Sequence, residues 1–377
     1  MDDALTRNRY FDALTTTTDL AWMGQNTNHI RAHPAVKEAM IAAIEAGEFN
    51  AYAPPLGFEA LRRAITDDLG VPDAEALVTE GGVSALAIVC RTYCRPGTTF
   101  VTTDPTWKWP CLFARQAGAE VIEIPIYDAA CDYRLTPAAL RAAVDARTAV
   151  IYLVDPNNPL GIRYTRDEIA AFATIARDAG ALLVHDCTYR DFADGHHPAL
   201  LEAPEHAVVS VSFSKWLGLA GLRIGALVTP RSMFETLAAS ATSVLGASVL
   251  AQRAALAGLS VKAEWMASVR RIDTANKARI HAAFTALPGF RLPVWPSHGN
   301  FLVIETGDAG IHPAALVEAA RRRRIMIRQG TYHTARFGDR FVKISTSVPE
   351  EWAERFCRLL PEMVAEARTL NDLPPQF

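Results

Sequence analysis

Residues 207–225 read AVVSVSFSKWLGLAGLRIG and hold the strongest pattern in this chain of 377 residues. The apolar, Val-rich run over 207–213 predicts a buried strand, and Lys215 follows it almost directly. A lone lysine after a strand is usually a surface cation, but apolar residues and a glycine-rich turn surround this one. Because burial disfavours the charged ammonium, we expect the Lys215 amine to have a lowered pKa and to act as an imine-forming nucleophile.

Hydroxyl and guanidinium groups flank this lysine. Ser212, Ser214 and Arg223 can together hold a phosphate, since hydroxyls and an arginine fork suit its oxygens. The glycines of the turn are not spaced as G-x-G-x-x-G, so the dinucleotide-binding pattern does not apply here. The stretch therefore combines a candidate reactive amine with a candidate anion site.

Strand-like and helix-like segments alternate around this stretch, from about residue 36 to 250. The expected strands are short, rich in Val and Ile, and apolar on both faces, which is typical of a sheet covered by helices on two sides. We therefore expect an α/β fold with a three-layer, doubly wound, mostly parallel sheet. The expected strands are Ala76–Thr79, Thr99–Thr103, Glu120–Pro125, Ala149–Val154, Ala181–His185, Ala207–Phe213 and Ile224–Val228. Helices expected between them include Pro137–Val144 and Arg166–Ala179.

The pattern changes beyond about residue 250. One long helical stretch is expected over Ala251–Leu287, followed by shorter elements. We expect residues 36–250 to form a large domain and 251–377 a smaller α+β domain, with 1–35 an irregular arm that contributes to the small domain. The later elements are expected at Phe301–Glu305, Pro313–Arg324, Phe341–Ser345 and Glu350–Thr369.

The composition excludes several classes of protein. Half of the residues are hydrophobic and 21% are charged, so low-complexity disorder is excluded as the main state. Lys and Arg number 38 against 41 Asp and Glu, which argues against nucleic-acid binding through a broad basic surface. The apolar runs are too short to cross a bilayer, and the start MDDALTRNRY has no signal-peptide core. We expect a soluble, cytoplasmic protein whose six cysteines are free, buried thiols.

Three further motifs have ordinary structural explanations when each is taken alone. A helix opens after a strand at Gly81-Gly82-Val83-Ser84, where backbone N–H groups can bind an anion. Residues 155–161, DPNNPLG, are typical of a turn. Asp186 ends an expected strand and could cap a helix. Its neighbours His185 and Cys187 have no ligand set with metal-site spacing around them, so we expect no metal site.

Together these motifs resemble the fold-type I pyridoxal-phosphate (PLP) enzymes. Within them the chain is similar to the class I and II aminotransferase family, and in style to its histidinol-phosphate-aminotransferase-like branch. The pattern S-x-S-K-x-x-G-L-A-G-L-R-x-G over 212–225 is highly specific, and the resemblance extends from about Asn26 to Met363. It implies pyridoxal 5'-phosphate as cofactor, amino acid and 2-oxo acid substrates, and a homodimer. The catalytic residues would be Lys215, as the Schiff-base lysine, Asp186 and Tyr189.

The resemblance also implies roles for single residues. Asp186 would pair with the pyridinium nitrogen and keep it protonated, while Asn158 and Tyr189 would contact the phenolic oxygen. Trp107 would stack on the pyridine ring. Tyr52, in the segment Tyr52-Ala-Pro-Pro-Leu-Gly57, would reach the cofactor phosphate of the neighbouring subunit. Within one subunit the phosphate would be bound by Gly82, Val83, Ser84, Ser212, Ser214 and Arg223.

The chain departs from the family where an arginine of an R-I-S segment usually grips the substrate carboxylate. Here the segment reads Phe341-Val-Lys343-Ile-Ser345, and lysine is a point charge without the planar fork of arginine. Either the carboxylate is held more loosely, or another residue takes over, or the substrate differs. The candidate replacements are Arg328, Arg336 and Arg340. The substrate side is expected at Gly24, Asn158, Lys343 and Arg328.

Three hypotheses about function follow. The leading one is transamination, in which the Lys215 amine moves a proton on the substrate and a second 2-oxo acid restores the cofactor. The alternative, motivated by Lys343, is a PLP-dependent cyclase, eliminase, decarboxylase or oxidase acting on a non-standard amino acid. A non-enzymatic PLP sensor or inactive enzyme is disfavoured, because every expected cofactor residue is present.

Overall fold

A seven-stranded sheet forms the centre of the computed structural model, which describes residues 4–241, 243–370 and 373. Its strands are β2 (Glu75–Thr79), β3 (Thr99–Asp104), β4 (Glu120–Pro125), β5 (Thr148–Val154), β6 (Leu182–Asp186), β7 (Ala207–Ser212) and β8 (Gly225–Thr229). They are ordered β2-β8-β7-β6-β5-β3-β4. Strand β8 runs antiparallel to both neighbours, and the other pairs are parallel. This confirms the expected doubly wound sheet, with every strand within one residue of its expected position.

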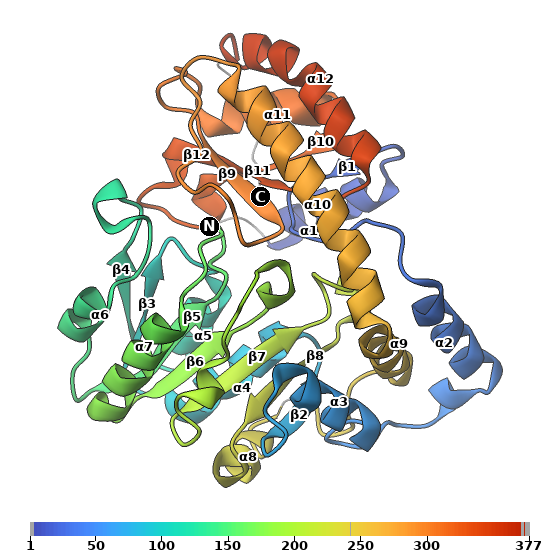
Figure 1. Ribbon diagram of the computed structural model, residues 1–377, viewed down its shortest axis with the longest axis vertical. Coiled ribbons are helices and arrows are strands. Elements are labelled where there is room, and N and C mark those ends of the chain that lie inside the picture. The colour runs from blue at the N-terminus through green and yellow to red at the C-terminus, as the bar shows by residue number, and fades with distance from the viewer. Residues whose placement is uncertain (1–3, 242, 371–372, 374–377) are drawn as a thin grey trace.

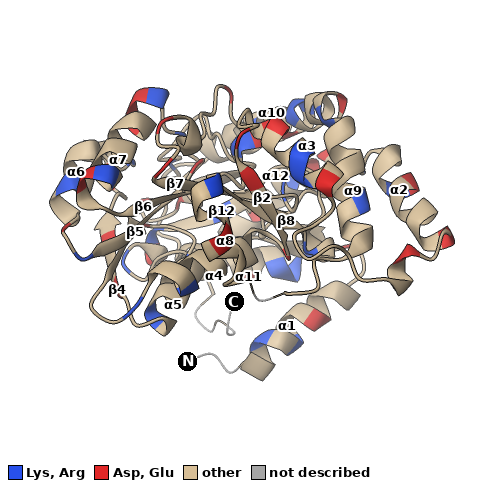
Figure 2. Cartoon of the chain, turned by 90° about the horizontal axis from the view of Figure 1, so that it is seen from below, with Lys and Arg blue, Asp and Glu red and all other residues tan. Residues whose placement is uncertain are grey.

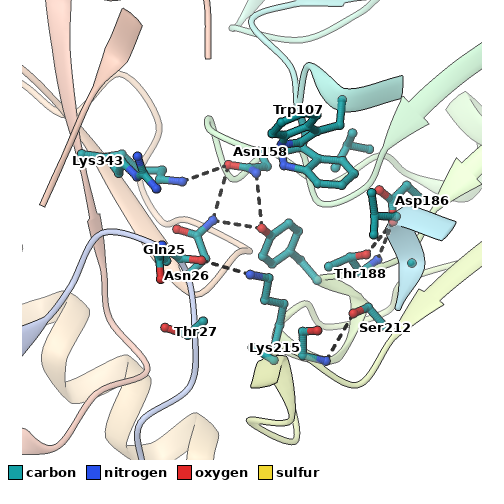
Figure 3. A pocket seen from close by; sticks show the side chains of 18 of the residues that line it. Gln25, Asn26, Thr27, Trp107, Asn158, Asp186, Thr188, Ser212, Lys215 and Lys343 are labelled. Atoms are coloured by element: carbon teal, nitrogen blue, oxygen red, sulfur yellow. Dashed lines mark hydrogen bonds between the residues drawn. The ribbon is translucent and has the colours of Figure 1, made fainter. Parts of the chain in front are cut away.

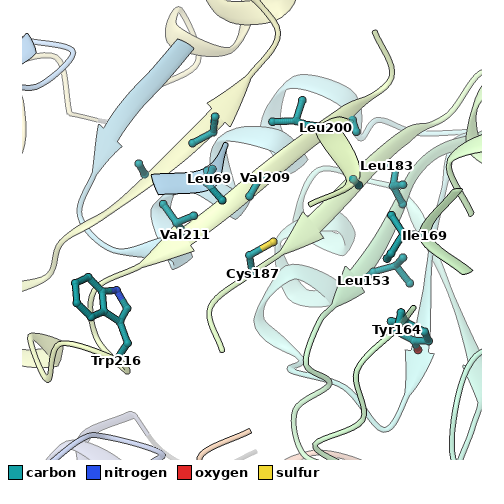
Figure 4. Packing of buried hydrophobic residues seen from close by; sticks show 14 of the residues in the cluster. Leu69, Leu153, Tyr164, Ile169, Leu183, Cys187, Leu200, Val209, Val211 and Trp216 are labelled. Atoms are coloured by element: carbon teal, nitrogen blue, oxygen red, sulfur yellow. The ribbon is translucent and has the colours of Figure 1, made fainter. Parts of the chain in front are cut away.

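Helices cover both faces of this sheet (Figure 1). One face packs on α3 (Glu59–Leu69), α6 (Pro137–Ala143), α7 (Arg166–Ala179) and α9 (Val249–Ser260), with α2 (Pro34–Glu45) alongside. The other face packs on α4 (Gly82–Tyr93), α5 (Trp109–Gln116) and α8 (Arg231–Ala238). Successive strand residues point to opposite faces. Leu153 and Leu183 therefore lie in the first core, shown in Figure 4, and Tyr152 and Val184 in the second.

Local signals explain where a helix such as α7 begins and ends. The Thr165 hydroxyl accepts the backbone N–H of Glu168, and the Glu168 carboxylate accepts the backbone N–H of Thr165. This reciprocal capping box satisfies two N–H groups at the start of the helix. The helix ends at Gly180, whose φ of 67° lies in the left-handed region that glycine adopts without strain. The predicted helix over 166–179 is confirmed.

The single long helix expected over Ala251–Leu287 is wrong. The chain forms two helices, α9 and α10 (Lys262–Thr285), because Val261 has φ −112° and ψ 12°, outside the helical region. The break lets α9 stay against the sheet while α10 crosses to another core. Trp265 of α10 packs in the sheet core and Phe284 packs in the core of the small unit.

The small unit contains a three-stranded antiparallel sheet (Figure 1). Its strands are β9 (Phe301–Glu305), β11 (Arg328–Gln329) and β12 (Phe341–Ser345), in the order β11-β12-β9. Helices α10, α11 (Pro313–Arg322) and α12 (Glu350–Ala367) contribute to the same core. Strand β1 (Ala21–Trp22) pairs in parallel with β10 (Ile325–Met326), so the N-terminal segment is attached to this unit. The expected domain boundaries, after residues 35 and 250, stay a prediction.

The arm expected to be irregular over 1–35 contains a helix, α1 (Ala4–Thr16). Apolar residues do not repeat along one face of this segment, and Leu14 is the one residue of α1 that is buried. Figure 2 shows α1 at the edge of the molecule, away from the central sheet. Tyr10 and Phe11 pack with Leu14, Leu20 and Met326 in a small cluster. Contacts with that distant segment, rather than local periodicity, therefore hold the helix.

Surface features complete the fold. None of the described helices is long and apolar enough to cross a membrane. The six cysteines are free, and four of them are buried. Charges of both signs are interspersed on the outer helices in Figure 2.

Candidate active site

A pocket of about 350 Å³ lies where the carboxyl ends of β5, β6 and β7 approach the N-terminal segment and the small sheet. Ligands of open α/β sheets commonly bind at this end of the strands. Most of the predicted site residues line this one pocket. They are Gly24, Gly82, Val83, Trp107, Asn158, Asp186, Tyr189, Ser212, Ser214, Lys215, Arg223, Arg328 and Lys343.

Two predicted cofactor residues do not line it. Ser84 lies in the first turn of α4, and its hydroxyl donates to the carbonyl of Glu80 at 3.4 Å. Tyr52 is 80% exposed in the segment before α3. The role expected for Tyr52 requires a neighbouring subunit and stays a prediction.

Lys215 follows β7 and extends into the pocket (Figure 3). Its Nζ donates to the backbone carbonyl of Gln25 at 3.0 Å. The pKa of this amine is lowered to about 8, and burial is the largest cause. The positive charges of Arg223 and Arg328 contribute to this lowered pKa, and the carboxylate of Asp186 opposes them. A substantial fraction of the amine is therefore neutral near pH 8, as a nucleophile requires.

One end of the pocket gathers groups that bind anions. Gly82, the first residue of α4, lines it, and the backbone N–H groups of a first helical turn have no partner inside the helix. A Cβ at Gly81 would lie 2.5 Å from Arg223 Nη2, so glycine lets the guanidinium approach the helix start. We call Gly82, Ser212, Ser214 and Arg223 the anion-cradle end. Its guanidinium, hydroxyls and helix N-terminus suit a phosphate group.

A buried carboxylate, Asp186, lies at the end of β6. Its Oδ2 accepts the hydroxyl of Tyr152 at 3.0 Å, and its Oδ1 accepts the hydroxyl and the backbone N–H of Thr188 at 2.6 and 3.2 Å. Burial raises the pKa of Asp186, while these hydrogen bonds oppose the rise. Hydroxyl and amide donors hold this carboxylate in place and leave it open to a cation from the pocket.

Amide and hydroxyl groups form a network in the middle of the pocket (Figure 3). The Asn158 Nδ2 donates to the Tyr189 hydroxyl at 3.3 Å, and its Oδ1 accepts from Lys343 Nζ at 3.3 Å. Asn26 joins both groups, since its Nδ2 lies 3.0 Å from the Tyr189 hydroxyl and 3.4 Å from Asn158 Oδ1. One hydrogen-bond network therefore joins three predicted site residues, Asn158, Tyr189 and Lys343, to Asn26, which was not predicted.

The opposite end of the pocket holds two cations. Arg328 on β11 and Lys343 on β12 are direct register partners, and their exposed fractions are 4% and 2%. The Arg328 guanidinium lies 4.2 Å from the ring centre of Tyr332 and 5.5 Å from that of Phe11. Burial lowers the pKa of Lys343 well below its ordinary value, and the charges of Arg328 and Lys215 add to this effect. We call Arg328 and Lys343 the strand-pair end.

Of the three candidate replacements for the family's arginine, Arg328 is the one that lines the pocket. Arg336 and Arg340 are about half exposed and do not line the pocket. Arg336 Nε lies 3.7 Å from a carboxylate oxygen of Asp104, and Arg340 Nη2 lies 3.5 Å from one of Glu305. These two arginines serve contacts outside the pocket.

The structure brings His196 beside His185 and Cys187, with donor atoms within 4.8 Å of one another, although their spacing in the sequence indicated no such set. His185 Nδ1 accepts the backbone N–H of Ala199 at 3.1 Å, so its Nε2 carries the proton and donates to Asp155 Oδ2 at 3.2 Å. Both nitrogens of His185 are therefore engaged in hydrogen bonds. His196 Nε2 lies 3.2 Å from the same Asp155 Oδ2, so the Asp155 carboxylate faces both imidazoles.

Several lining residues were not predicted individually. Gln25, Asn26 and Thr27 directly follow Gly24, which was expected on the substrate side, but no local pattern indicated their contacts. Trp109 lies two residues after Trp107 and could have been suspected from that neighbour. No signal in the sequence pointed to Val154, Thr188, Ala220 and Tyr332.

Comparison with known proteins places this geometry in context. The family model for aminotransferase class I and II matches residues 18–360. The histidinol-phosphate aminotransferase of Shouchella clausii (strain KSM-K16) is 31% identical over 293 residues, 76% of each chain. That of Geobacillus sp. (strain WCH70) is 28% identical over 360 residues, 94% of this chain and 92% of the relative.

Solved structures share the fold. The N-succinyldiaminopimelate aminotransferase from Mycobacterium tuberculosis matches with a TM-score of 0.84 and 24% identity, over 94% of this chain and 96% of that chain. A double mutant of the Thermus thermophilus aspartate aminotransferase matches with a TM-score of 0.83 and 23% identity, over 96% of each chain. At such identities the likeness establishes the arrangement of helices and strands.

Proposed function

Because this chain belongs to the aminotransferase class I and II family and is a pyridoxal 5'-phosphate-dependent transferase, we propose that its pocket transfers an amino group from an amino acid to a 2-oxo acid. One observation carries the assignment to this pocket. The Lys215 amine opens into the same space as the Asp186 carboxylate and the anion-cradle end. An amine, a partner for a ring nitrogen and a phosphate site are the groups that this cofactor needs from a protein.

The residues fit the cofactor at both of its charged ends. Arg223, close to the start of α4 because position 81 is glycine, offers cationic and N–H donors for the phosphate. Asp186 is a buried carboxylate that accepts hydrogen bonds from two hydroxyls and a backbone N–H, so a pyridinium nitrogen would supply a cation for it. Trp107 lines the same pocket and would stack on the ring.

The bound cofactor supplies an aldehyde carbon and an electron-withdrawing ring. Lys215 contributes an amine that is partly neutral near pH 8 and can hold or release one proton beside the substrate α-carbon. Asp186, fixed by Tyr152 and Thr188, keeps a positive charge on the ring nitrogen. Asn158 and Tyr189 present hydrogen-bond donors to the phenolic oxygen.

The strand-pair end favours a substrate with an anionic group. Arg328 and Lys343 place two buried basic groups side by side, and an anion bound between them would favour the charged form of the Lys343 amine. The relatives described above are named for histidinol phosphate, aspartate and N-succinyldiaminopimelate, and each of these compounds carries anionic groups. We therefore favour amino donors with a carboxylate or phosphate over neutral amines.

Exposed apolar residues support a homodimer. Tyr52, Phe49 and Val244 are 80%, 58% and 72% exposed, and such surfaces are typical of protein interfaces. If Tyr52 reaches the neighbouring site, mixing inactive Tyr52→Ala and Lys215→Ala proteins will restore activity, because each hybrid dimer then has one intact site. Hybrids that stay inactive while sedimenting as dimers would exclude a shared site.

Absorption spectroscopy tests the function. We expect the purified protein with PLP to show the absorption band of the lysine-bound cofactor. An amino donor should convert this band to that of pyridoxamine phosphate, and a 2-oxo acid should restore it. The panel should contain L-histidinol phosphate, L-aspartate, neutral amino acids and simple amines. A protein that binds PLP but yields a product other than the 2-oxo acid would refute transamination.

A further inference from the structure

Asn26 occupies a position in the pocket that none of the assigned roles explains. It is 1% exposed, and its φ of 54° lies in the left-handed region, where asparagine is among the few tolerated residues besides glycine. Its side-chain amide nitrogen contacts both the Tyr189 hydroxyl and Asn158 Oδ1, and Figure 3 shows Asn26 beside Asn158. A strained backbone at a fully buried polar residue is a reason to look for a specific task.

The hydrogen bonds at Tyr189 determine which way its hydroxyl points. A phenol oxygen can accept two hydrogen bonds and donate one. The Nδ2 groups of Asn26 and Asn158 both donate to this oxygen, at 3.0 and 3.3 Å. With its acceptor positions taken by two N–H groups, the hydroxyl must use its own proton as a donor toward the pocket. Burial raises the pKa of Tyr189, and the Asn26 hydrogen bond opposes the rise.

The small sheet fixes the orientation of the Asn26 amide. The backbone N–H of Asn26 donates to Ser345 Oγ at 2.8 Å, which leaves the Ser345 hydroxyl proton to donate to Asn26 Oδ1 at 3.4 Å. Asn300 Nδ2 donates to the backbone carbonyl of Asn26 at 3.0 Å. With its oxygen turned to Ser345, Asn26 must turn its NH₂ group to Tyr189 and Asn158.

We propose that Asn26 is a positioning residue that compels the Tyr189 hydroxyl to donate its hydrogen bond to the phenolic oxygen of the cofactor. This inference rests on the proposed function, which places that oxygen beside Tyr189 and Asn158. Donation to the phenolic oxygen favours its negative form, and so it favours loss of the proton from the nitrogen that joins Lys215 to the cofactor. Asn26 thus tunes this proton without contacting the nitrogen.

Two substitutions at Asn26 separate the effect of its side-chain amide from the effect of its strained backbone. Asn26→Gly keeps a left-handed backbone without strain and removes the amide. Asn26→Asp keeps the shape and replaces the NH₂ donor with an acceptor that competes for the Tyr189 proton. The pKa of the lysine-bound cofactor, read from absorbance against pH, should rise by roughly one unit in Asn26→Asp and by less in Asn26→Gly. The dissociation constant of PLP should also rise several-fold in both variants.

A double-mutant cycle with Tyr189→Phe tests whether Asn26 acts through this hydroxyl. We expect Tyr189→Phe alone to raise the absorbance pKa and Asn26→Gly to add no further shift in that background. Asn28→Ala is the matched control, because Asn28 is a buried asparagine of the same segment that donates to the backbone carbonyl of Trp216 instead. It should leave the absorbance pKa unchanged.

The possible failures are distinguishable. If the wild-type protein shows the expected absorption band and both Asn26 variants keep its absorbance pKa, the inference about Asn26 is wrong. The proposed function would then still stand. Equal shifts from Asn26→Gly with and without the Tyr189 hydroxyl would also overturn it, because Asn26 would then act by another route. A wild-type protein that shows no band with PLP would overturn both the proposed function and this inference.

Discussion

At the anion-cradle end the pocket is lined by residues that directly follow strands of the central sheet or begin a helix, whereas at the strand-pair end it is lined by two short strands of the small sheet. Ser212 ends β7, and Gly82 begins α4. Arg328 and Lys343 come from β11 and β12, against which the N-terminal segment packs. The first end therefore belongs to one rigid sheet, and the second joins three separate parts of the chain.

The two ends also differ in how their charges are balanced. Arg223 donates to the backbone carbonyls of Ala220 and Glu80, at 2.9 and 3.3 Å. The Lys343 amine is buried beside the Arg328 guanidinium, and it donates a hydrogen bond to the neutral amide of Asn158. Arg223 is exposed, so water can solvate its charge, whereas the Lys343 amine is buried and a charge there is costly. We infer that an anionic group of the substrate completes the site beside Lys343.

Removing the shared amine should have the largest effect. Lys215→Ala leaves both ends of the pocket intact and removes the nucleophile and proton carrier, so kcat/KM should fall by roughly 10⁴-fold or more. Single-turnover spectroscopy of the variant with PLP will measure this loss. PLP should still bind at the anion-cradle end, without the band of the lysine-bound form. A variant that retains activity would refute the assigned role of Lys215.

Neutralising the buried carboxylate should have the next largest effect. Asp186→Asn keeps the shape but cannot hold a positive charge on the ring nitrogen, so kcat should fall roughly 100-fold to 1000-fold. Steady-state kinetics measure the fall, and Thr188→Val serves as control because it removes one hydrogen bond but leaves the carboxylate. A loss as large in Thr188→Val as in Asp186→Asn would show that orientation, and not charge, is decisive.

Substitutions at the strand-pair end should separate substrate binding from stability. Lys343→Met should raise KM for anionic donors at least roughly tenfold and leave PLP affinity unchanged. It also removes a buried cation, so the melting temperature should rise by about 2 °C or more. Lys343→Arg should keep or lower KM, since its fork can bind a carboxylate. If Lys343→Met weakens PLP binding as much as substrate binding, the two ends are not independent.

The pH dependence of cofactor loading should show the smallest of these effects. The pKa of Lys215 in the folded protein is lowered to about 8 from 10.5, so the reactive neutral amine increases as pH rises through 8. The rate at which the apo protein takes up PLP should therefore increase roughly tenfold from pH 7 to pH 9. Stopped-flow absorbance measures this rate. A rate that keeps rising toward pH 10 would contradict the lowered pKa.

The same pKa predicts how stability depends on pH. Between pH 8 and 10.5 the unfolded chain binds a proton at this lysine that the folded chain does not bind, so the contribution of Lys215 to stability rises with pH in that window. Lys215→Met apo protein should lack this rise. If the melting temperature changes equally with pH in the wild-type and Lys215→Met apo proteins, the lowered pKa of Lys215 is contradicted.

Much of the anion-cradle end and of the large sheet was predictable from the sequence. Each strand of that sheet is a short apolar run bounded by turn residues. Asp186 ends one of these strands, and Lys215 and Gly82 follow others within a few residues. These patterns depend on residues that are neighbours in the sequence, so they can be recognised without knowledge of the rest of the fold. The break at Val261 and the helix α1 were not predicted, because packing against distant residues determines both.

By itself the sequence determined the doubly wound sheet, the lysine that follows β7 and the family of the chain, because these depend on residues that are neighbours along the chain. The tertiary structure alone decided that Asn26 lies against Asn158, 132 residues away, and bonds Ser345, 319 residues away. It also decided that Lys343 faces Arg328 across two strands. Hydrogen bonds and repulsion act through space over a few ångströms, and only the folded chain brings these groups within that range.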